Sequence, residues 1–204
     1  MEDTYKTVAG MATDQYKEKG SRFIGFLFPI DSEENVKAHL AALKKEFYNA
    51  THICYAYTLG HLGTEQTRLN DDGEPSGSAA RPIYGQLQSA GLKDVLAAVV
   101  RFFGGTKLGV PGLINAYKTT TQLTLARAEI IEKHILERAS LQTDYTRMNS
   151  AMQLLKKEDA RITGMDYTDN RSEIRFEIRQ SQYARIASQA EQLPFLQLTH
   201  LETV

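Results

Sequence analysis

The stretch VLAAVVRFFGGTKLGVPGLINAY (Val95–Tyr117) decides the fold of the first half of the chain. It opens with the apolar run VLAAVV, which is rich in β-branched residues and predicts a buried strand. Four glycines, a proline and Lys107 follow, and then a helical pattern begins. One face of that helix is expected to carry Leu113, Tyr117, Thr120 and Thr124. The stretch therefore predicts a buried strand joined to a long helix by a glycine-rich corner.

The residues before this stretch predict two more strands and two helices. After a short polar start, residues 21–30 have a strand pattern, and residues 51–60 form a second, tyrosine-rich one. Between them lies an amphipathic helix, with Asp31 and Glu34 at capping-box spacing. Residues 61–82 are dense in Gly, Asp, Asn, Ser and Pro, which predicts a long loop. A short helix is expected over residues 82–91.

The second half has a different order of elements. The patterns predict strands over residues 135–145, 161–168, 172–180 and 195–204, and helices over 147–160 and 182–193. Asp169 and Asn170 are expected to form the turn between the middle two strands. The order β-α-β-β-α-β is the split-βαβ or ferredoxin-like pattern. The chain is therefore predicted to be an α+β protein with two domains, residues 1–135 and 136–204.

The composition excludes several classes of protein. The chain has 204 residues, 24% of them charged, and a net charge of -1, so any basic surface for nucleic acid must be local. Cys54 has no second cysteine with which to form a disulfide. No apolar run approaches the roughly 20 residues that a membrane span needs, and the polar N-terminus lacks a signal-peptide pattern. These features predict a cytoplasmic protein with no membrane contact.

The segment NDDGEPSGSAARP (residues 70–82) has two interpretations. Asp71, Asp72 and Glu74 lie close together, so they could hold a divalent cation or supply an acid and a base. The acids are adjacent instead of alternating, which is not the calcium-loop pattern. Asp-Gly and Glu-Pro also mark turns, and Asp side chains cap backbone amides. A turn with capping carboxylates is the simpler interpretation.

The glycine-rich corner after Arg101 also has two interpretations. A strand-to-helix connection of this kind can direct backbone N–H groups at an anion. The spacing matches neither the P-loop nor the dinucleotide-binding fingerprint, and Lys107 precedes the last glycines. The glycines can instead supply positive φ and close packing of the helix on the sheet. ATP hydrolysis is not supported.

Individual polar residues give weaker indications. His52 and Cys54 share one face of their strand and could form a catalytic pair, although a buried structural cysteine is the simpler interpretation. Phe102, Phe103 and several tyrosines could stack on bases or pack in the core. His61 is expected to be solvated. Arginines at 171, 175 and 179 share their segment with Glu173 and Glu177, which predicts a cross-paired surface.

Four segments together resemble the IMPACT/YigZ family. They are KGSRFIGF, ATHICYAYTLG, NDDGEPSGSAARPIYGQL and AAVVRFFGGTKLGVPGLINAY. The resemblance implies an N-terminal domain with the fold of domain IV of elongation factor G, and a ferredoxin-like C-terminal domain similar to its domain V. It also implies a role in translation, because eukaryotic members of the family are cytoplasmic regulators of translation that act by protein contact.

The resemblance further implies a face that binds a partner. From the first motif this face comprises Asp71, Asp72, Gly73, Glu74, Pro75, Ser76, Gly77, Ser78 and Arg81. From the second it comprises Arg101, Gly104, Gly105, Lys107, Leu108, Gly109, Gly112, Asn115, Tyr117 and Lys118. This chain departs from the family pattern at three positions: Ala80 and Pro111 replace glycines, and Asn115 replaces a basic residue. Lys118 lies on a neighbouring helical face and is expected to compensate.

Three functions follow as hypotheses. The first is a noncatalytic binding protein that contacts RNA, the ribosome or a translation factor, with no catalytic residue, cofactor or metal. The second is a metal-assisted hydrolase or phosphotransferase, in which Asp71, Asp72 and Glu74 hold the metal and the loop from Gly104 to Gly112 cradles a phosphate. The third is an adaptor that binds proteins alone. The first is preferred over the second, because the glycine-rich loop lacks the P-loop spacing and Asn115 replaces a basic residue.

Overall fold

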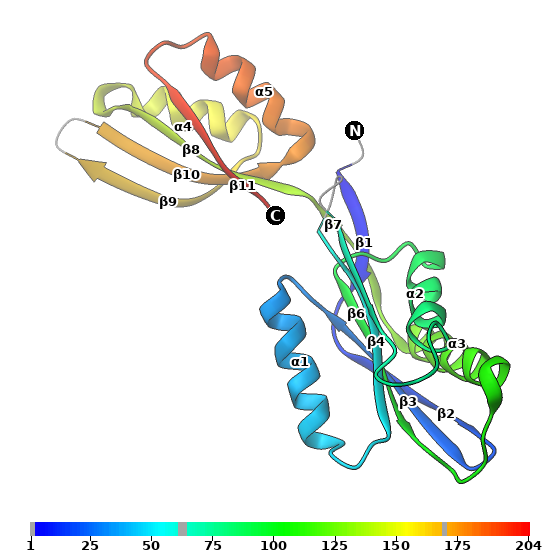
Figure 1. The fold of residues 1–204 in the computed structure, drawn as a ribbon. Coiled ribbons are helices and arrows are strands. Elements are labelled where there is room, and N and C mark those ends of the chain that lie inside the picture. Colours follow the sequence, from blue (N-terminus) through cyan, green and yellow to red (C-terminus); the bar gives the residue numbers. More distant parts are fainter. Residues whose placement is uncertain (1–2, 61–64, 169–170) are drawn as a thin grey trace. The chain divides into compact units, whose positions relative to one another are not determined.

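The structure is a computed structural model that describes residues 3–60, 65–168 and 171–204 (Figure 1). The chain divides into two compact units, one of Tyr5–Glu132 and one of Met1–Thr4 with Lys133–Val204. The division falls within two paired strands, β1 (Thr4–Val8) and β7 (Ile130–His134). The assignment of residues 1–135 and 136–204 as two domains stays a prediction. His61 and the predicted turn at Asp169 and Asn170 lie outside the described residues.

The first unit is built on a five-stranded antiparallel sheet. The strand order is β2 (Ala12–Glu18), β3 (Ser21–Pro29), β6 (Val95–Phe102), β4 (His52–Leu59) and β5 (Gln66–Asn70). β6 lies at the centre, and every residue from Val95 to Arg101 is buried. A strand covered on both faces needs apolar side chains at successive positions, which explains the run VLAAVV.

Helices cover both faces of this sheet (Figure 1). On one face, α1 (Glu33–Glu46) buries Val36 and Leu43 in a core that includes Phe26 and Leu96. On the other, α2 (Ala80–Ser89) and α3 (Gly109–Arg127) pack in a core that includes Phe23, Leu87 and Tyr117. The predicted buried face of α3, with Leu113, Tyr117, Thr120 and Thr124, is confirmed. The unit therefore has three layers, with the sheet in the middle.

Three predictions for this unit are wrong in detail. The polar start contains β1 and β2, and the predicted loop contains β5. β2 and β5 are the edge strands of the sheet, and all of β5 is exposed, so neither has an apolar pattern that marks a strand. The N-cap of α1 is Ser32 instead of Asp31, because the Ser32 hydroxyl accepts a hydrogen bond from the Asn35 N–H at 3.2 Å.

The close packing of α3 on the sheet depends on a glycine. A Cβ atom at Gly25, in β3, would lie 2.1 Å from the Thr124 hydroxyl oxygen. Real Cβ atoms do not make contacts this short. The strand can therefore approach the threonine-lined face of α3 only because residue 25 has no side chain.

The second unit has the predicted β-α-β-β-α-β order of elements. Its strands are β8 (Leu136–Asp144), β9 (Arg161–Thr168), β10 (Arg171–Arg179) and β11 (Gln197–Thr203), in the antiparallel order β11-β8-β10-β9. α4 (Met148–Lys157), preceded by a 3-10 turn at Tyr145–Arg147, and α5 (Gln180–Glu191) bury Leu155 and Ile186 against this sheet. Both helices lie on the same face (Figure 1). The similarity of the two units to domains of elongation factor G stays a prediction.

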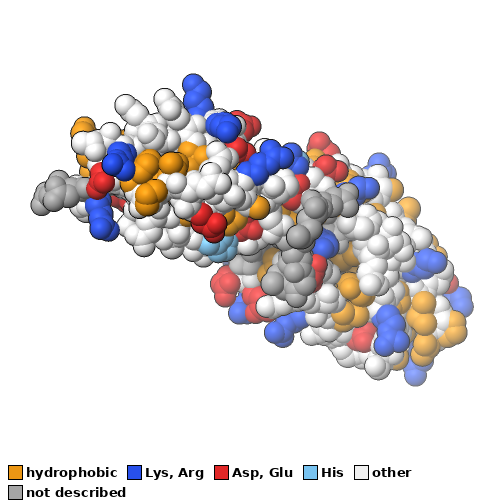
Figure 2. Space-filling view, turned by 90° about the horizontal axis from the view of Figure 1, so that it is seen from above, with side chains coloured by type: hydrophobic (Ala, Val, Ile, Leu, Met, Phe, Trp, Pro, Cys, Tyr) orange, Lys and Arg blue, Asp and Glu red, His pale blue; other side chains and the backbone are white. Residues whose placement is uncertain are grey.

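Several charged side chains of the second unit pair across its strands, as predicted, but Glu177 is buried instead of lying on a solvated surface. Glu177 contacts Arg138 and Arg161, and Arg175 contacts Asp166. Figure 2 shows basic and acidic side chains interspersed on the visible face. The N-terminal Asp3 joins this unit, because Arg179 donates two hydrogen bonds to its carboxylate, at 2.7 and 3.1 Å.

Within residues 3–60, 65–168 and 171–204, no helix has the length and hydrophobicity to span a bilayer.

Candidate functional site

The two family motifs meet at one cavity in the first unit. Its volume is about 380 Å³. The first motif contributes Glu74 and Pro75 to its wall, and the second contributes Arg101 and the segment from Lys107 to Val110. The remaining lining residues are Thr51, His52, Phe103 and Leu113. Residues far apart in the sequence therefore form a single concave site.

A buried ion pair lies at the polar end of this cavity. Arg101 Nη1 donates to Glu74 Oε1 at 2.5 Å, and the Tyr117 hydroxyl donates to the same oxygen at 2.8 Å. The Arg101 and Glu74 side chains are 6% and 3% exposed. Buried charges are stable only when paired and hydrogen-bonded. This network therefore fixes the acidic loop, β6 and α3 against one another.

The two aspartates of the acidic motif have structural contacts. The Asp71 carboxylate accepts hydrogen bonds from the backbone N–H groups of Gly77, Ala79 and Ala80, at 2.8 to 3.1 Å. It thus caps the first turn of α2, whose N-cap residue provides no side-chain acceptor. Asp72 Oδ2 accepts from the Ile53 N–H at 2.6 Å. These contacts favour the turn-and-capping interpretation, and no group of three His, Cys, Asp or Glu side chains among the described residues is placed to hold a metal ion.

His52 faces Glu74 from the neighbouring strand. β4 pairs with β6 so that His52 lies opposite Arg101. Its Nδ1 lies 2.7 Å from the Asp72 carbonyl oxygen, which can only accept, so Nδ1 carries the proton. In the neutral ring Nε2 is then an acceptor, and it lies 3.9 Å from Glu74 Oε2. The ring is held in one tautomer and presents Nε2 beside a carboxylate oxygen.

Cys54 is a structural residue instead of a nucleophile. Its side chain is buried, and the thiol contacts the Asp71 carbonyl oxygen at 3.0 Å and the Tyr117 hydroxyl at 3.3 Å. Burial raises the pKa of the Cys54 thiol far above its usual range. Burial and the neighbouring Cys54 likewise raise the pKa of the Tyr117 hydroxyl. Since a reactive thiolate needs a lowered pKa, the hypothesis of a His52–Cys54 catalytic pair is wrong.

The glycine-rich corner allows close backbone packing and leads into the first turn of α3. A Cβ atom at Gly104 would lie 1.8 Å from the backbone of Gly20, so the two turns touch through their backbones. Gly105 and Gly109 have φ values of +88° and +72°, a conformation that side chains disfavour. Pro111 lies in the first turn of α3, where its missing N–H would have no helical partner. The replacement of a family glycine by Pro111 is therefore compatible with the helix.

The other predicted residues lie around the cavity or outside it. Ser78 is buried, and its hydroxyl has no hydrogen-bond partner among the described residues. Ala80 is buried at the start of α2, where its helical backbone needs no glycine. The predicted residues that do not line the cavity and are exposed are Asp72, Gly73, Ser76, Arg81, Gly104, Gly105, Asn115 and Lys118, while Asp71, Gly77 and Gly112 are half-buried. The structure thus brings only part of the predicted face together.

Several lining residues were not among the predicted site residues. Thr51 directly precedes β4 and His52 is its first residue, while Phe103 directly follows β6. Val110 and Leu113 belong to the first turns of α3. All five lie within the quoted motifs, but the antiparallel pairing of β4 with β6 brings Thr51, His52 and Phe103 to the cavity, and α3 brings Val110 and Leu113. Their positions within the quoted motifs are the sequence feature that could have identified them as site residues.

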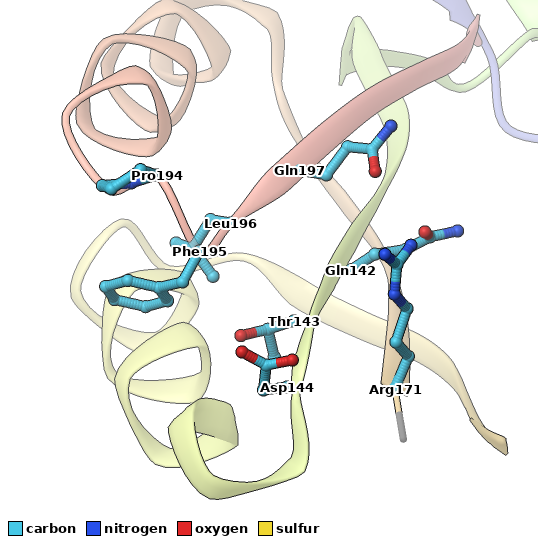
Figure 3. A pocket seen from close by; sticks show the side chains of 8 residues that line it. All are labelled: Gln142, Thr143, Asp144, Arg171, Pro194, Phe195, Leu196 and Gln197. Carbon is cyan, nitrogen blue, oxygen red and sulfur yellow. The ribbon is translucent and has the colours of Figure 1, made fainter. Parts of the chain in front are cut away.

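A second cavity, of about 200 Å³, lies in the second unit (Figure 3). Thr143 and Asp144 from β8, Arg171 from β10 and Gln197 from β11 line it, together with Phe195. Arg147 lies over the Phe195 ring, with its guanidinium carbon 4.5 Å from the ring centre. None of these residues belongs to the two motifs. The cavity of the first unit is therefore the candidate site.

Comparisons with known proteins agree with the motifs. Residues 19–125 match the Impact N-terminal domain. IMPACT family member YvyE of Bacillus subtilis is 34% identical over 167 residues, which is 82% of this chain and 76% of the relative. IMPACT family member YigZ of Escherichia coli is 35% identical over 150 residues, 73% of this chain and 74% of the relative. A crystal structure of a hypothetical protein has a TM-score of 0.76, 30% identity and 99% coverage of both chains.

Proposed function

Because the chain belongs to the IMPACT family, we propose that it is a noncatalytic binding protein that acts in translation or its regulation. In this proposal the cavity formed by the two motifs contacts RNA, the ribosome or a translation factor in the cytoplasm. The translational role rests on the family resemblance. The binding role rests on the contacts within the cavity.

One observation carries the binding role: Oε1 of Glu74, the acidic residue of the cavity wall, pairs with Arg101 and accepts a hydrogen bond from Tyr117. Acid or base catalysis needs a group that is free to exchange a proton with a substrate. Asp71 and Asp72, which a metal-assisted hydrolase would use, are engaged by backbone N–H groups. The site therefore has the rigid, half-apolar wall of a binding pocket, and the hydrolase hypothesis gains no support.

The experiment is cosedimentation with ribosomes over a series of salt concentrations. We expect the protein to pellet with ribosomes at low salt and to be released as salt rises, because phosphate contacts displace counterions. Lys107→Ala should weaken pelleting, whereas Lys45→Ala, on α1 at the opposite face of the sheet, should not. The proposal would be overturned if the wild-type protein fails to pellet with ribosomes, both alone and in complex with ribosome-bound factors.

Nuclease treatment separates the RNA-binding version from the adaptor version. Affinity capture is repeated with extracts in which RNA has been digested. If translation factors are still recovered, and the Lys107→Ala variant loses them, the cavity binds protein. If the translation factors are recovered only when the RNA is intact, the cavity binds RNA.

A further inference from the structure

We propose that the cavity binds one unpaired nucleotide of single-stranded RNA, with its base against Phe103 and its phosphate at Lys107 and the start of α3. We further infer that His52 and Glu74 select adenine or cytosine over uracil, through the adenine N6 or cytosine N4 amino group. This inference rests on the proposed function and names the ligand of that site.

The apolar part of the cavity suits a nucleobase. Pro75, Leu108, Val110 and Leu113 line it, and Phe103 stands at its rim with 47% of its surface exposed. The guanidinium carbon of Arg101 lies 5.7 Å from the centre of the Phe103 ring. An exposed aromatic ring beside cationic groups is the usual platform for an unpaired base, because every base has a π face that can stack.

The rim beside this ring suits a phosphate. α3 has no acidic residue in its first turn and no side-chain cap, so the N–H groups of that turn lack an acceptor from the N-cap side chain. Lys107 is exposed, and it forms no ion pair or hydrogen bond with a described residue. A helix N-terminus with an adjacent free lysine attracts an anion.

One buried atom without a partner, Arg101 Nε, supports a ligand independently, and a Glu74 oxygen at the same cavity can accept a further hydrogen bond. Glu74 is 8% exposed and lines the cavity, and its Oε2 accepts no hydrogen bond from any described residue. Arg101 is 5% exposed, lines the same cavity and has an Nε atom without a partner in the described part of the chain. Buried polar groups are normally hydrogen-bonded. The unpartnered Arg101 Nε atom therefore indicates that the cavity takes a polar ligand, and Glu74 Oε2, whose neighbour is His52 Nε2 at 3.9 Å, can accept from a donor group of that ligand.

The inner acceptors define which bases fit. Glu74 Oε2 and His52 Nε2 lie 3.9 Å apart and both accept hydrogen bonds when the histidine is neutral. An amino group placed between them can donate to both. Adenine N6 and cytosine N4 are such groups, whereas uracil presents a carbonyl oxygen at the corresponding position. Uracil would leave the carboxylate oxygen facing another acceptor, which is unfavourable.

The test measures fluorescence anisotropy with labelled single-stranded hexanucleotides of adenosine, cytidine or uridine, at low salt. We expect the adenosine and cytidine oligomers to bind at least about tenfold more tightly than the uridine oligomer. This is the difference in affinity that lost or mismatched hydrogen bonds produce. Phe103→Ala should weaken binding about 5-fold or more, because stacking on an aromatic ring is lost. Lys107→Ala should weaken binding and lower the slope of log affinity against log salt by about 0.7.

Matched controls separate the cavity from general surface effects. Tyr48→Ala removes an aromatic ring that is 85% exposed and does not line the cavity, and Lys45→Ala removes an exposed lysine of α1. Neither should change affinity by more than about 2-fold, as for surface changes distant from a site. His52→Phe should remove the preference for adenosine and cytidine over uridine while Phe103 still supports binding. Thermal melting confirms that each variant is folded.

The outcomes distinguish this inference from the proposed function. If ribosomes bind the protein but none of the oligomers do, the nucleotide inference is overturned and the proposed function stands. Equal losses in the Phe103 and Tyr48 variants would overturn the placement of the base. Equal affinity for all three oligomers would overturn the role of His52 and Glu74. If an acidic peptide competes for the cavity and RNA does not, the ligand is a protein.

Discussion

Arg101 and Glu74 form an ion pair in which Nη1 lies 2.5 Å from Oε1 and both side chains are almost completely buried. Arg101 comes from β6, whereas Glu74 comes from the loop between β5 and α2. Tyr117 of α3 donates to the same carboxylate. This relationship holds three segments of the chain in the geometry that forms the cavity.

Removing the carboxylate should destabilise the first unit strongly. Glu74→Ala leaves the Arg101 guanidinium buried without its partner, so we expect a loss of about 3–5 kcal/mol in the free energy of unfolding. Tyr117→Phe removes one hydrogen bond to a charged acceptor and should cost about 1.5–3 kcal/mol. Urea unfolding measures both. Glu34→Gln, at an exposed position of α1, is the control and should change the free energy by less than about 0.5 kcal/mol.

The glycine corner predicts a position that no side chain can occupy. Gly104→Ala would place a Cβ atom against the backbone of Gly20, which cannot rotate away as a side chain can. We expect a loss of about 3 kcal/mol or more, at the upper end of overpacking costs. Gly10→Ala is the matched control, because its Cβ atom would meet nothing within 4 Å. Equal melting temperatures for the two variants would contradict the close contact.

Much of the fold follows from the sequence because the central elements have unambiguous patterns. β6 is apolar at successive positions because it is covered on both faces, and α3 repeats its buried residues at helical spacing. The sequence predicts the correct order of elements in the second unit because β8, β10 and both helices have clear apolar patterns, while the exposed edge strands β9 and β11 have weaker ones. β2 and β5 were missed because edge strands are exposed and their residues carry little periodic hydrophobicity.

The candidate site was only partly predictable. The motifs identified Glu74, Arg101 and Lys107, but not the pairing of Glu74 with Arg101 over a separation of 27 residues. The pairing register places His52 opposite Arg101, and no local pattern specifies that register. The exposed Phe103 resembles a core residue in the sequence, because an apolar run precedes it. Contacts between distant segments therefore determine which motif residues face the cavity.

The Cys54 thiol should be unreactive in the folded protein. Its pKa is raised by burial, so the thiolate fraction at pH 8 is very small. We expect negligible reaction with a disulfide reagent such as Ellman's reagent under native conditions and complete reaction in denaturant. The ratio of the two rates is the measurement. Rapid reaction of the native protein would show that the thiol is accessible and would contradict the buried contact with Tyr117.

Asp3 should make the second unit sensitive to acid. The hydrogen bonds from Arg179 hold the pKa of the Asp3 carboxyl far below its usual range, and those from Ser181 add to this effect. A lowered pKa in the folded state gives stability that is complete above the unfolded value, about 4, and is lost as pH falls toward the folded value. Asp3→Asn should therefore lower the melting temperature at neutral pH, and its difference from the wild-type protein should shrink below about pH 4.

The comparison needs a control at an acid that is exposed, whereas Asp3 is buried. Asp31→Asn changes an exposed carboxylate of the first unit, which accepts a hydrogen bond from the Ser32 hydroxyl at 2.9 Å. Its melting temperature should follow that of the wild-type protein at every pH. A constant difference between wild-type and Asp3→Asn proteins down to pH 2 would show that Asp3 does not titrate as its contacts predict.

The central place of β6 also constrains how the first unit is made during synthesis. In the completed sheet β3 and β4 are not neighbours, because β6 lies between them. Both strands are synthesised before residues 95–102, so the backbone groups at the edges that β6 later pairs have no strand partner while the chain is still short. A nascent chain that ends before β6 can hold neither the sheet nor the cavity. Translational pausing within the segment from β4 to α2 would thus prolong an aggregation-prone stage, and chaperones that bind exposed strands should act on it.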